Sequence, residues 1–191
     1  MSNLNLILAS SSPRRIELLK KGGYDPVIIP PQVTENLPDG IGPKDAVLFL
    51  ALKKALAVEA VVLKGDAIII AADTVVYLDE IIGKPETQED AFAILTKLRG
   101  KPHQVMSGVA ILKAGTDEKE VFCETSTVYF KEYTDGEIMA YIRTPEPYDK
   151  AGAYAIQGGW GKYVDRVEGD YHNIMGLPLE RTLAVLERFA E

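Results

Sequence analysis

The order of apolar and polar residues along the chain alternates between the spacing of strands and the spacing of helices. Residues 4–9 form a short apolar run that predicts a strand, and residues 13–21 have a helical pattern that ends at Gly22 and Gly23. The chain therefore begins with a βα unit. Residues 24–29 predict a second strand.

A long loop is predicted at residues 30–43, because the four prolines in this polar stretch are incompatible with regular structure. Loops of this length in compact domains often carry function. An Ala- and Leu-rich pattern then predicts a helix from residue 44 to about residue 63. Residues 67–78, a near-continuous apolar run rich in β-branched side chains, predict a central strand.

Helices and strands also alternate in the second half of the chain. Thr87 is a candidate N-cap, and Thr134 precedes Glu137 by three residues, the spacing of a capping box. The predicted elements are a helix at 87–99, paired strands at 103–112 and 121–130, a helix at 134–143, a strand at 162–167 and an amphipathic helix with Leu179, Leu183, Leu186 and Phe189 on one side.

The composition is that of an ordinary globular protein. With 191 residues, 47% hydrophobic and 26% charged, the chain is expected to form one domain over residues 1–191 that could have two lobes. No apolar run approaches the ~20 residues needed to cross a bilayer, and the first ten residues lack the basic start and the length of a signal peptide. We therefore expect a cytoplasmic protein without a membrane partner.

The net charge argues against one class of partner, and the cysteine content excludes disulfides and one class of metal site. The net charge of −7 argues against a nucleic-acid duplex as partner, but it allows a small anionic substrate where positive charge is gathered locally. Cys123 is the single cysteine, so no internal disulfide can form, and one cysteine with two histidines cannot supply an ordinary zinc site. Any metal should therefore be a hard cation held by carboxylates.

Residues 8–15, with the sequence LASSSPRR, place three hydroxyl and two guanidinium groups where a strand turns into a helix. A helix N-terminus offers unpaired N–H groups, Pro13 suits the first helical position, and arginines bind phosphate oxygens through paired hydrogen bonds. The segment therefore predicts a phosphate-binding cradle. The alternative is that Ser12 is only a helix cap and that Arg14 and Arg15 form a solvated face.

Asp73 interrupts the apolar run at residues 67–78, where an isolated carboxylate would be costly unless it were paired or bound to a metal. We expect Asp73 at a strand end facing a cleft; the alternative is a structural residue that hydrogen-bonds a nearby turn. Glu35, in the proline-rich loop, is the candidate second acid, although loop glutamates are usually solvated. Thr74 could orient a substrate or simply favour the strand.

Two lysines add to the basic set. Lys54 lies in the predicted helix and Lys84 in a Gly-Lys-Pro segment, and each alone would be an ordinary surface residue. Together with two carboxylates, however, basic side chains are what metal-assisted attack of water on a polyphosphate requires. His172 is expected to be structural rather than a general base. Neither a P-loop nor a G-x-G-x-x-G motif occurs in the sequence.

Taken together, the chain resembles the Maf family of nucleotide pyrophosphatases through six motifs in order: LILASSSPRR, IIAADTVV, GKP, MSGVAI, DKAGAYAIQG and YHNIMGLPL. The resemblance runs from about Leu6 to Leu179. It implies an α/β fold with a mixed sheet, flanking helices and two lobes around a cleft, similar to the inosine triphosphate pyrophosphatases (Ham1). It also implies a homodimer that hydrolyses nucleoside triphosphates to monophosphate and pyrophosphate with Mg²⁺ or Mn²⁺, a housekeeping role for the nucleotide pool.

The resemblance also implies roles for individual residues. Asp73 would accept the proton of the attacking water and, with Glu35, would hold the divalent metal. Gln157 lies in the K-A-G-A-Y-x-I-Q-G pattern of the subfamily that acts on dTTP and UTP, and its amide offers a donor and an acceptor to a pyrimidine edge. The residues that would contact the substrate are Ser10, Arg14, Arg15, Lys54, Thr74, Lys84 and Gln157.

Two alternatives stay open at this point. Trp160 stands where the family keeps small residues, so the enzyme could instead be a purine or 7-methyl-GTP pyrophosphatase, although that methylated-nucleotide branch has Glu in place of Gln157. The family's link to septum formation suggests a non-catalytic nucleotide-binding regulator of cell division. An acid in a central strand with a second acid in a loop favours the enzyme.

Overall fold

The computed structural model describes residues 5–62 and 66–189, so the predicted strand start at Leu4 lies outside the described residues. The helix predicted to run to about Leu63 ends earlier, at Glu59. The elements follow in the order β1 (Asn5–Leu8), α1 (Pro13–Lys21), β2 (Val27–Ile28), α2 (Pro43–Glu59), β3 (Ala67–Leu78), β4 (Glu80–Ile82), α3 (Gln88–Leu98), β5 (Pro102–Lys113), β6 (Lys119–Phe130), α4 (Asp135–Tyr141), the 3₁₀ helices η1 (Glu146–Asp149), η2 (Ala151–Ala153) and η3 (Gly161–Tyr163), β7 (Val164–Glu168), α5 (Tyr171–Met175) and α6 (Leu179–Phe189).

The strands form one mixed sheet in the order β2-β1-β3-β5-β6-β7, with β4 paired to β3. The first three strands are parallel: β1 pairs with both β2 and β3, and Leu8 is in register with Ile28 and Ile70. In contrast, β4 is antiparallel to β3 and β7 is antiparallel to β6. The expected α/β class with a mixed sheet and flanking helices is therefore confirmed.

The chain divides into two compact units. The first unit comprises Met1–Asp73, Ser107–Glu124 and Gly176–Glu191, and the second comprises Thr74–Met106 and Thr125–Met175. The long strands β3, β5 and β6 each contribute residues to both units. The candidate site residues are distributed over the two units.

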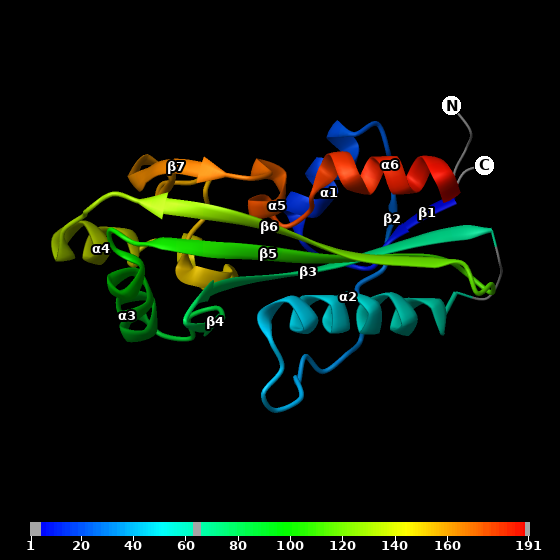
Figure 1. The fold of residues 1–191 in the computed structure, drawn as a ribbon, viewed down its shortest axis with the longest axis horizontal. Coiled ribbons are helices and arrows are strands. Elements are labelled where there is room, and N and C mark those ends of the chain that lie inside the picture. The colour runs from blue at the N-terminus through cyan, green and yellow to red at the C-terminus, as the bar shows by residue number, and fades with distance from the viewer. Residues whose placement is uncertain (1–4, 63–65, 190–191) are drawn as a thin grey trace. The chain divides into compact units, whose positions relative to one another are not determined.

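In the first unit, α2 covers one face of the strands and α1 and α6 cover the other (Figure 1). Small side chains let α2 approach the sheet closely: Ala51 and Ala55 belong to the same buried cluster as Ile69 of β3. At Gly108 of β5, an added Cβ would lie only 2.4 Å from the carbonyl oxygen of Val47. This close contact fixes α2, and with it the lysines that α2 carries, against the sheet.

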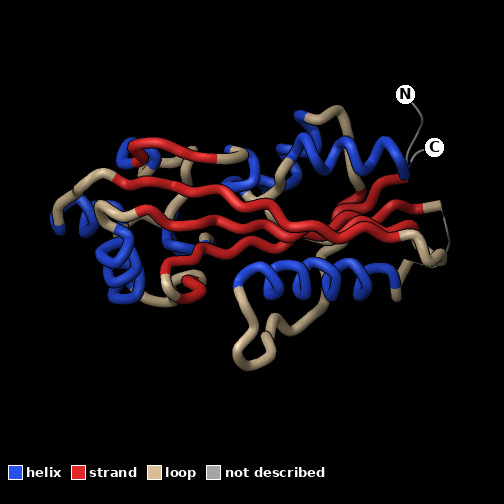
Figure 2. The backbone as a smooth tube through the Cα atoms, viewed as in Figure 1, coloured by secondary structure: helices blue, strands red, loops and turns tan. Residues whose placement is uncertain are grey.

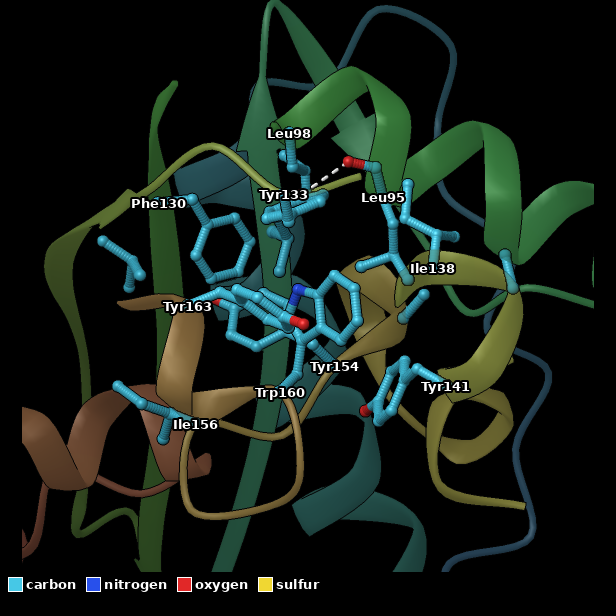
Figure 3. Packing of buried hydrophobic residues seen from close by; sticks show 14 of the residues in the cluster. Leu95, Leu98, Phe130, Tyr133, Ile138, Tyr141, Tyr154, Ile156, Trp160 and Tyr163 are labelled. Atoms are coloured by element: carbon cyan, nitrogen blue, oxygen red, sulfur yellow. Dashed lines mark hydrogen bonds between the residues drawn. The ribbon is translucent and has the colours of Figure 1, made fainter. Parts of the chain in front are cut away.

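Several aromatic side chains are grouped in the core of the second unit (Figure 3). The Trp160 ring lies 4.8 Å from the ring of Tyr133, 4.6 Å from that of Tyr141 and 4.5 Å from that of Tyr163, measured between centroids. The hydroxyl of Tyr133 donates to the carbonyl oxygen of Leu95 at 2.6 Å, which ties the cluster to α3. Trp160, which stands where the Maf family keeps small residues, is only 1% exposed. Its ring is therefore part of the hydrophobic core.

Most predicted elements are present. The helix at 13–21 and the strand at 67–78 have the predicted bounds, and both threonine caps form complete capping boxes, Thr87 with Asp90 and Thr134 with Glu137. A loop precedes α2 as expected (Figure 2). The second strand is only two residues long, and β4, α5 and the 3₁₀ helices were not predicted. Across the described ranges, no helix has the length and apolarity needed to cross a bilayer.

Candidate active site

The predicted phosphate-binding cradle lies at the turn from β1 to α1 in the first unit. Ser10 is buried, and its hydroxyl oxygen accepts a hydrogen bond of 3.2 Å from the backbone N–H of Ser12. Ser12 occupies the N-cap position, but its side chain makes no capping hydrogen bond to the described residues, and Pro13 follows as the first helical residue. The alternative in which Ser12 serves only as a side-chain cap therefore finds no support.

Arg15 is held in a fixed orientation at this turn. Its Nε donates to the carbonyl oxygen of Gly176 at 2.9 Å, and its Nη1 donates to Oγ of Ser10 at 3.3 Å. Burial lowers the pKa of the guanidinium, whereas the nearby carboxylates of Asp73 and Glu35 raise it. Because an arginine stays protonated in proteins, the side chain presents a preoriented positive charge rather than a solvated one.

Arg14, next to it, is half-buried in the first turn of α1. Its positive charge lies close enough to Arg15 to lower the pKa of that guanidinium. The contacts above fix Arg15. Arg14 stays a predicted phosphate ligand on position alone.

Glu35, Lys54 and Asp73 form a charged triad in the first unit. Lys54 Nζ lies 2.5 Å from Oδ1 of Asp73 and 2.7 Å from Oε1 of Glu35. The side chains of Lys54 and Asp73 are 9% and 11% exposed, whereas that of Glu35 is 56% exposed. The two acids singled out from the sequence thus meet at one buried ammonium group.

Asp73 lies inside its strand and not at its end, so that part of the prediction is wrong. It is the seventh of the twelve residues of β3, and the apolar pattern continues on both sides of it. The strand continues because Ile69 and Ala71 belong to the core of the first unit while Val76 belongs to that of the second. The carboxylate is accommodated by pairing with Lys54 and not by reaching the edge of the sheet.

The loop that carries Glu35 is anchored by a neighbouring lysine. Lys53 Nζ donates to the carbonyl oxygen of Thr34 at 2.7 Å, one residue before Glu35. Because Lys53 and Lys54 are adjacent in α2, the same helical turn fixes both the backbone of the loop and its acid. The sequence pattern gave no role to Lys53 or to the Gly176 carbonyl, since neither contact is local in the chain.

The triad offers a cation two carboxylates. Among residues 5–62 and 66–189, no group of three or more His, Cys, Asp or Glu side chains is placed to hold a metal ion. Mg²⁺ bound with a nucleotide commonly uses one or two protein carboxylates and takes its other ligands from phosphate and water. The convergence of Glu35 and Asp73 on one positively charged atom therefore fits such an ion.

The other predicted residues, Thr74, Lys84 and Gln157, belong to the second unit. Thr74 follows Asp73 directly and is half-buried, so its side chain points to the opposite face of β3. Lys84 is exposed in the loop after β4, and Gln157 is exposed in the segment after η2.

One backbone contact joins two of the sequence motifs in the second unit. The N–H of Gly152 donates to the carbonyl oxygen of Gly83 at 3.0 Å. Gly152 has a φ of 73°, and an added Cβ would lie 2.8 Å from the side chain of Val76, so glycine is required there. The Gly-Lys-Pro segment with Lys84 is thereby fixed against the segment that leads to Gln157.

His172 and its neighbours have structural contacts. The N–H of His172 donates to Oδ1 of Asp170 at 2.7 Å at the start of α5. Asn173, which is fully buried, donates from Nδ2 to the carbonyl oxygen of Val105 and to Oγ of Ser126, at 3.0 and 2.9 Å. These contacts give the histidine-containing motif a role in holding α5 in the second unit.

Comparisons with known proteins show which family the chain is similar to. A family profile described as Maf-like protein matches residues 5–189. A dTTP/UTP pyrophosphatase of Dictyoglomus thermophilum is 47% identical over 96% of this chain and 95% of its own length. Proteins of the same name from Geobacillus sp. and Bdellovibrio bacteriovorus are 46% and 39% identical, each over 96% of this chain, and over 97% and 98% of their own lengths.

Among solved structures, the Ham1 protein of Staphylococcus aureus is similar in fold. It has a TM-score of 0.51 at 16% sequence identity, and the match covers 96% of this chain and 98% of that protein. At this identity the likeness concerns the fold alone. It confirms the architecture expected from the sequence resemblance.

Proposed function

Because the chain belongs to the Maf family, we propose that it is a nucleoside triphosphate pyrophosphatase that converts dTTP and UTP to their monophosphates and pyrophosphate. The observation that carries this proposal is the triad of Glu35, Lys54 and Asp73 beside the preoriented Arg15. Relatives that match nearly the full length of the chain bear the name dTTP/UTP pyrophosphatase, which supports the substrate.

In the proposed reaction, the oxygen of a water molecule forms a bond to the α-phosphorus. The bond from that phosphorus to the oxygen that bridges to the β-phosphate breaks, and pyrophosphate leaves. Asp73 takes the proton from the water, because it is the buried carboxylate of the triad and Lys54 holds it at 2.5 Å in a fixed position. The remaining negative charge of the leaving group is stabilised by basic side chains.

Charge stabilisation is assigned to the cradle and to the lysines. Ser10 and Arg15 would bind phosphate oxygens at the N-terminus of α1, where the helix dipole favours an anion. Arg14, Lys54 and Lys84 would complete the positive surroundings of the phosphates. Their preorganisation matters because charge that develops in the transition state is stabilised without further rearrangement.

Glu35 and Asp73 are the residues that would hold a divalent cation, Mg²⁺ or Mn²⁺, which when bound would neutralise phosphate charge and lower the pKa of the attacking water. Selection of the base is assigned to the second unit, where the exposed amide of Gln157 offers a donor and an acceptor to uracil or thymine. Thr74 and Arg15 are the further positions proposed to affect specificity.

The direct test is release of pyrophosphate from a panel of canonical and modified nucleoside triphosphates, with and without Mg²⁺ or Mn²⁺. Metal-dependent release that is fastest with dTTP and UTP would support the proposal. Release mainly from a purine or from 7-methyl-GTP would keep the chemistry and refute the pyrimidine assignment. No release from any nucleotide would favour the non-catalytic regulator of cell division.

The assembly and location of the protein are proposed on the same resemblance. We expect a homodimer in the cytoplasm, acting on free nucleotides and not on a nucleic-acid duplex. Light scattering of the purified protein should give the mass of two chains, and fractionation of cells should place it with soluble proteins. A monomer mass, or recovery with membranes, would refute the respective expectation.

A further inference from the structure

Gln157 lies in a tightly folded segment of the second unit, residues 155–161, which we call the Gln157 segment. The N–H of Gly158 donates to the carbonyl oxygen of Ala155 at 3.1 Å, and the N–H of Gly161 donates to that of Gly158 at 3.1 Å. An added Cβ at Gly161 would lie 2.2 Å from the carbonyl oxygen of Ile156. The segment therefore consists of two successive turns that are packed against each other.

The two ends of this segment differ in how they are held. Trp160 is buried in the aromatic cluster near the end of the segment (Figure 3), and its ring is tilted by 33° relative to that of Tyr141. Gln157, in contrast, is exposed and is followed by Gly158 and Gly159. Paired glycines have the widest backbone freedom, so the direction of Gln157 depends on a contact that holds them.

Glu146 supplies that contact. Its two carboxylate oxygens lie 3.0 and 3.3 Å from the backbone N of Gly159, which donates to them. An added Cβ at Gly158 would lie 1.9 Å from Oε1 of Glu146, so the carboxylate packs directly against the backbone of Gly158. Both glycines after Gln157 are thus fixed by one acidic side chain.

Glu146 is itself held in place. It is the first residue of η1, and its carbonyl oxygen accepts a hydrogen bond of 2.8 Å from Lys150 Nζ. Burial, and after it the hydrogen-bonding and charge interactions with the carboxylate of Glu146, raise the pKa of Tyr141, so this carboxylate also lies beside the Tyr141 side chain. The acid therefore links η1, the aromatic core and the Gln157 segment within the second unit.

We propose that Glu146 is a positioning residue for nucleotide selection, whose carboxylate fixes residues 158–159 and thereby the direction of the Gln157 side chain. This rests on the proposed function, in which Gln157 contacts the base. A hydrogen bond from a backbone N–H to a carboxylate is stronger than one to a neutral acceptor. The negative charge of Glu146 therefore strengthens its hold on the backbone of Gly159. Glu146 touches neither the substrate nor the reacting atoms in this scheme.

The test compares Glu146→Ala, Glu146→Gln and the wild type with dTTP, UTP, CTP and dGTP. If the Gln157 segment is in its binding conformation about a tenth of the time without the carboxylate, KM for dTTP and UTP should rise about tenfold while kcat stays within about twofold. The preference for dTTP over CTP and dGTP should fall by a similar factor. Glu146→Gln keeps one neutral acceptor and should have an intermediate KM.

A matched control is Glu137→Ala. Glu137 also accepts a hydrogen bond from a backbone N–H, that of Thr134 at 2.7 Å, and it lies in the second unit at the start of α4. Its loss should lower stability without changing the order of preference among the nucleotides. If Glu146→Ala lowers kcat equally for all nucleotides, or changes nothing, a purely structural role is correct and the proposal is wrong.

Two measurements separate this proposal from the proposed function. Gln157→Ala should by itself reduce the preference for dTTP, and adding Glu146→Ala to it should cause no further reduction. If wild type and Gln157→Ala behave as stated but Glu146→Ala keeps wild-type selectivity, only the positioning role fails. Hydrogen exchange of residues 155–161 should be about tenfold faster in Glu146→Ala whether or not a nucleotide is turned over, and unchanged exchange would overturn the proposal independently of activity.

Discussion

The charged triad makes a strong prediction for Lys54→Met. The substitution keeps most of the aliphatic length of the side chain but removes the ammonium group that lies 2.5 Å from Asp73 and 2.7 Å from Glu35. At 2.5 Å and an effective dielectric constant of about 20, the attraction to Asp73 is about 7 kcal/mol before the cost of desolvation. What the variant loses is smaller, because both charges gave up water on folding.

The loss of unfolding free energy expected for Lys54→Met depends on the two acids that remain without the ammonium group. Asp73 would stay buried without its ion-pair partner, with only the more distant charge of Arg15 nearby, and breaking a buried pair in this way typically costs about 3–5 kcal/mol. The contact with the exposed Glu35 should contribute less than about 1 kcal/mol. Urea unfolding at pH 7 would measure the difference as a lower midpoint at an unchanged slope.

The adjacent lysine provides the control. Lys53→Met removes an ammonium group from the same helix, but Lys53 donates to the carbonyl oxygen of Thr34 near the surface, so the expected loss is about 1 kcal/mol or less. The double variant Lys54→Met with Asp73→Asn should recover part of the loss, because the uncompensated charge is removed. If Lys54→Met and Lys53→Met unfold at the same urea concentration, the buried pair does not have the assigned importance.

Three further predictions concern activity and pH. Asp73→Asn should lower kcat at least about a hundredfold with cooperative unfolding retained; turnover near that of the wild type would remove Asp73 from the catalytic role. Arg15→Ala should lower kcat/KM about tenfold to a hundredfold, and unchanged kinetics would place the phosphate cradle elsewhere. Burial lowers the pKa of His103 from 6.5 to about 4, so the unfolded chain takes up this proton first as the pH falls, and stability is lost between about pH 6.5 and pH 4. Relative to pH 8, the wild type at pH 5 should lose about 2 kcal/mol that His103→Gln does not lose, whereas parallel pH curves would contradict this assignment.

The sequence predicted helix starts and ends well where the residues that determine them are close together in the chain. The helix at 13–21 begins at a proline and ends before two glycines, and the capping boxes at Thr87 and Thr134 involve residues three positions apart. In the two capping boxes, the residues that define the start of the helix are also the ones that bond to each other. Short elements such as β4 and α5 carry too few residues to show a period, so their pattern cannot be distinguished from a loop.

The site depends on contacts between residues that are far apart in the sequence, and the spacing of residues along the chain does not predict such contacts. Lys54 is nineteen residues from each of its two acidic partners, one in a loop and one in the middle of a strand. The sequence indicated that burying the Asp73 carboxylate in an apolar run would cost free energy unless it were paired. In the structure, Lys54 is the partner that offsets this cost. The same limitation hid Glu146, because its partner in the structure is a backbone N–H thirteen residues away and no side-chain pattern reports it.

The charges of the first unit explain how an acidic protein can bind an anion. Its formal net charge is −7, yet the cluster of Lys54, Arg14 and Arg15 with the two acids carries one net positive charge. The acids hold Lys54 between them, so part of its charge is already compensated before a nucleotide binds. One residual positive charge is too little to balance a triphosphate, and exposed charges farther from the site than a Debye length are largely screened by salt, so they contribute little. Further positive charge is therefore needed at the phosphates, which is the physical reason for proposing that Lys84 and a divalent cation act together with the arginine cradle.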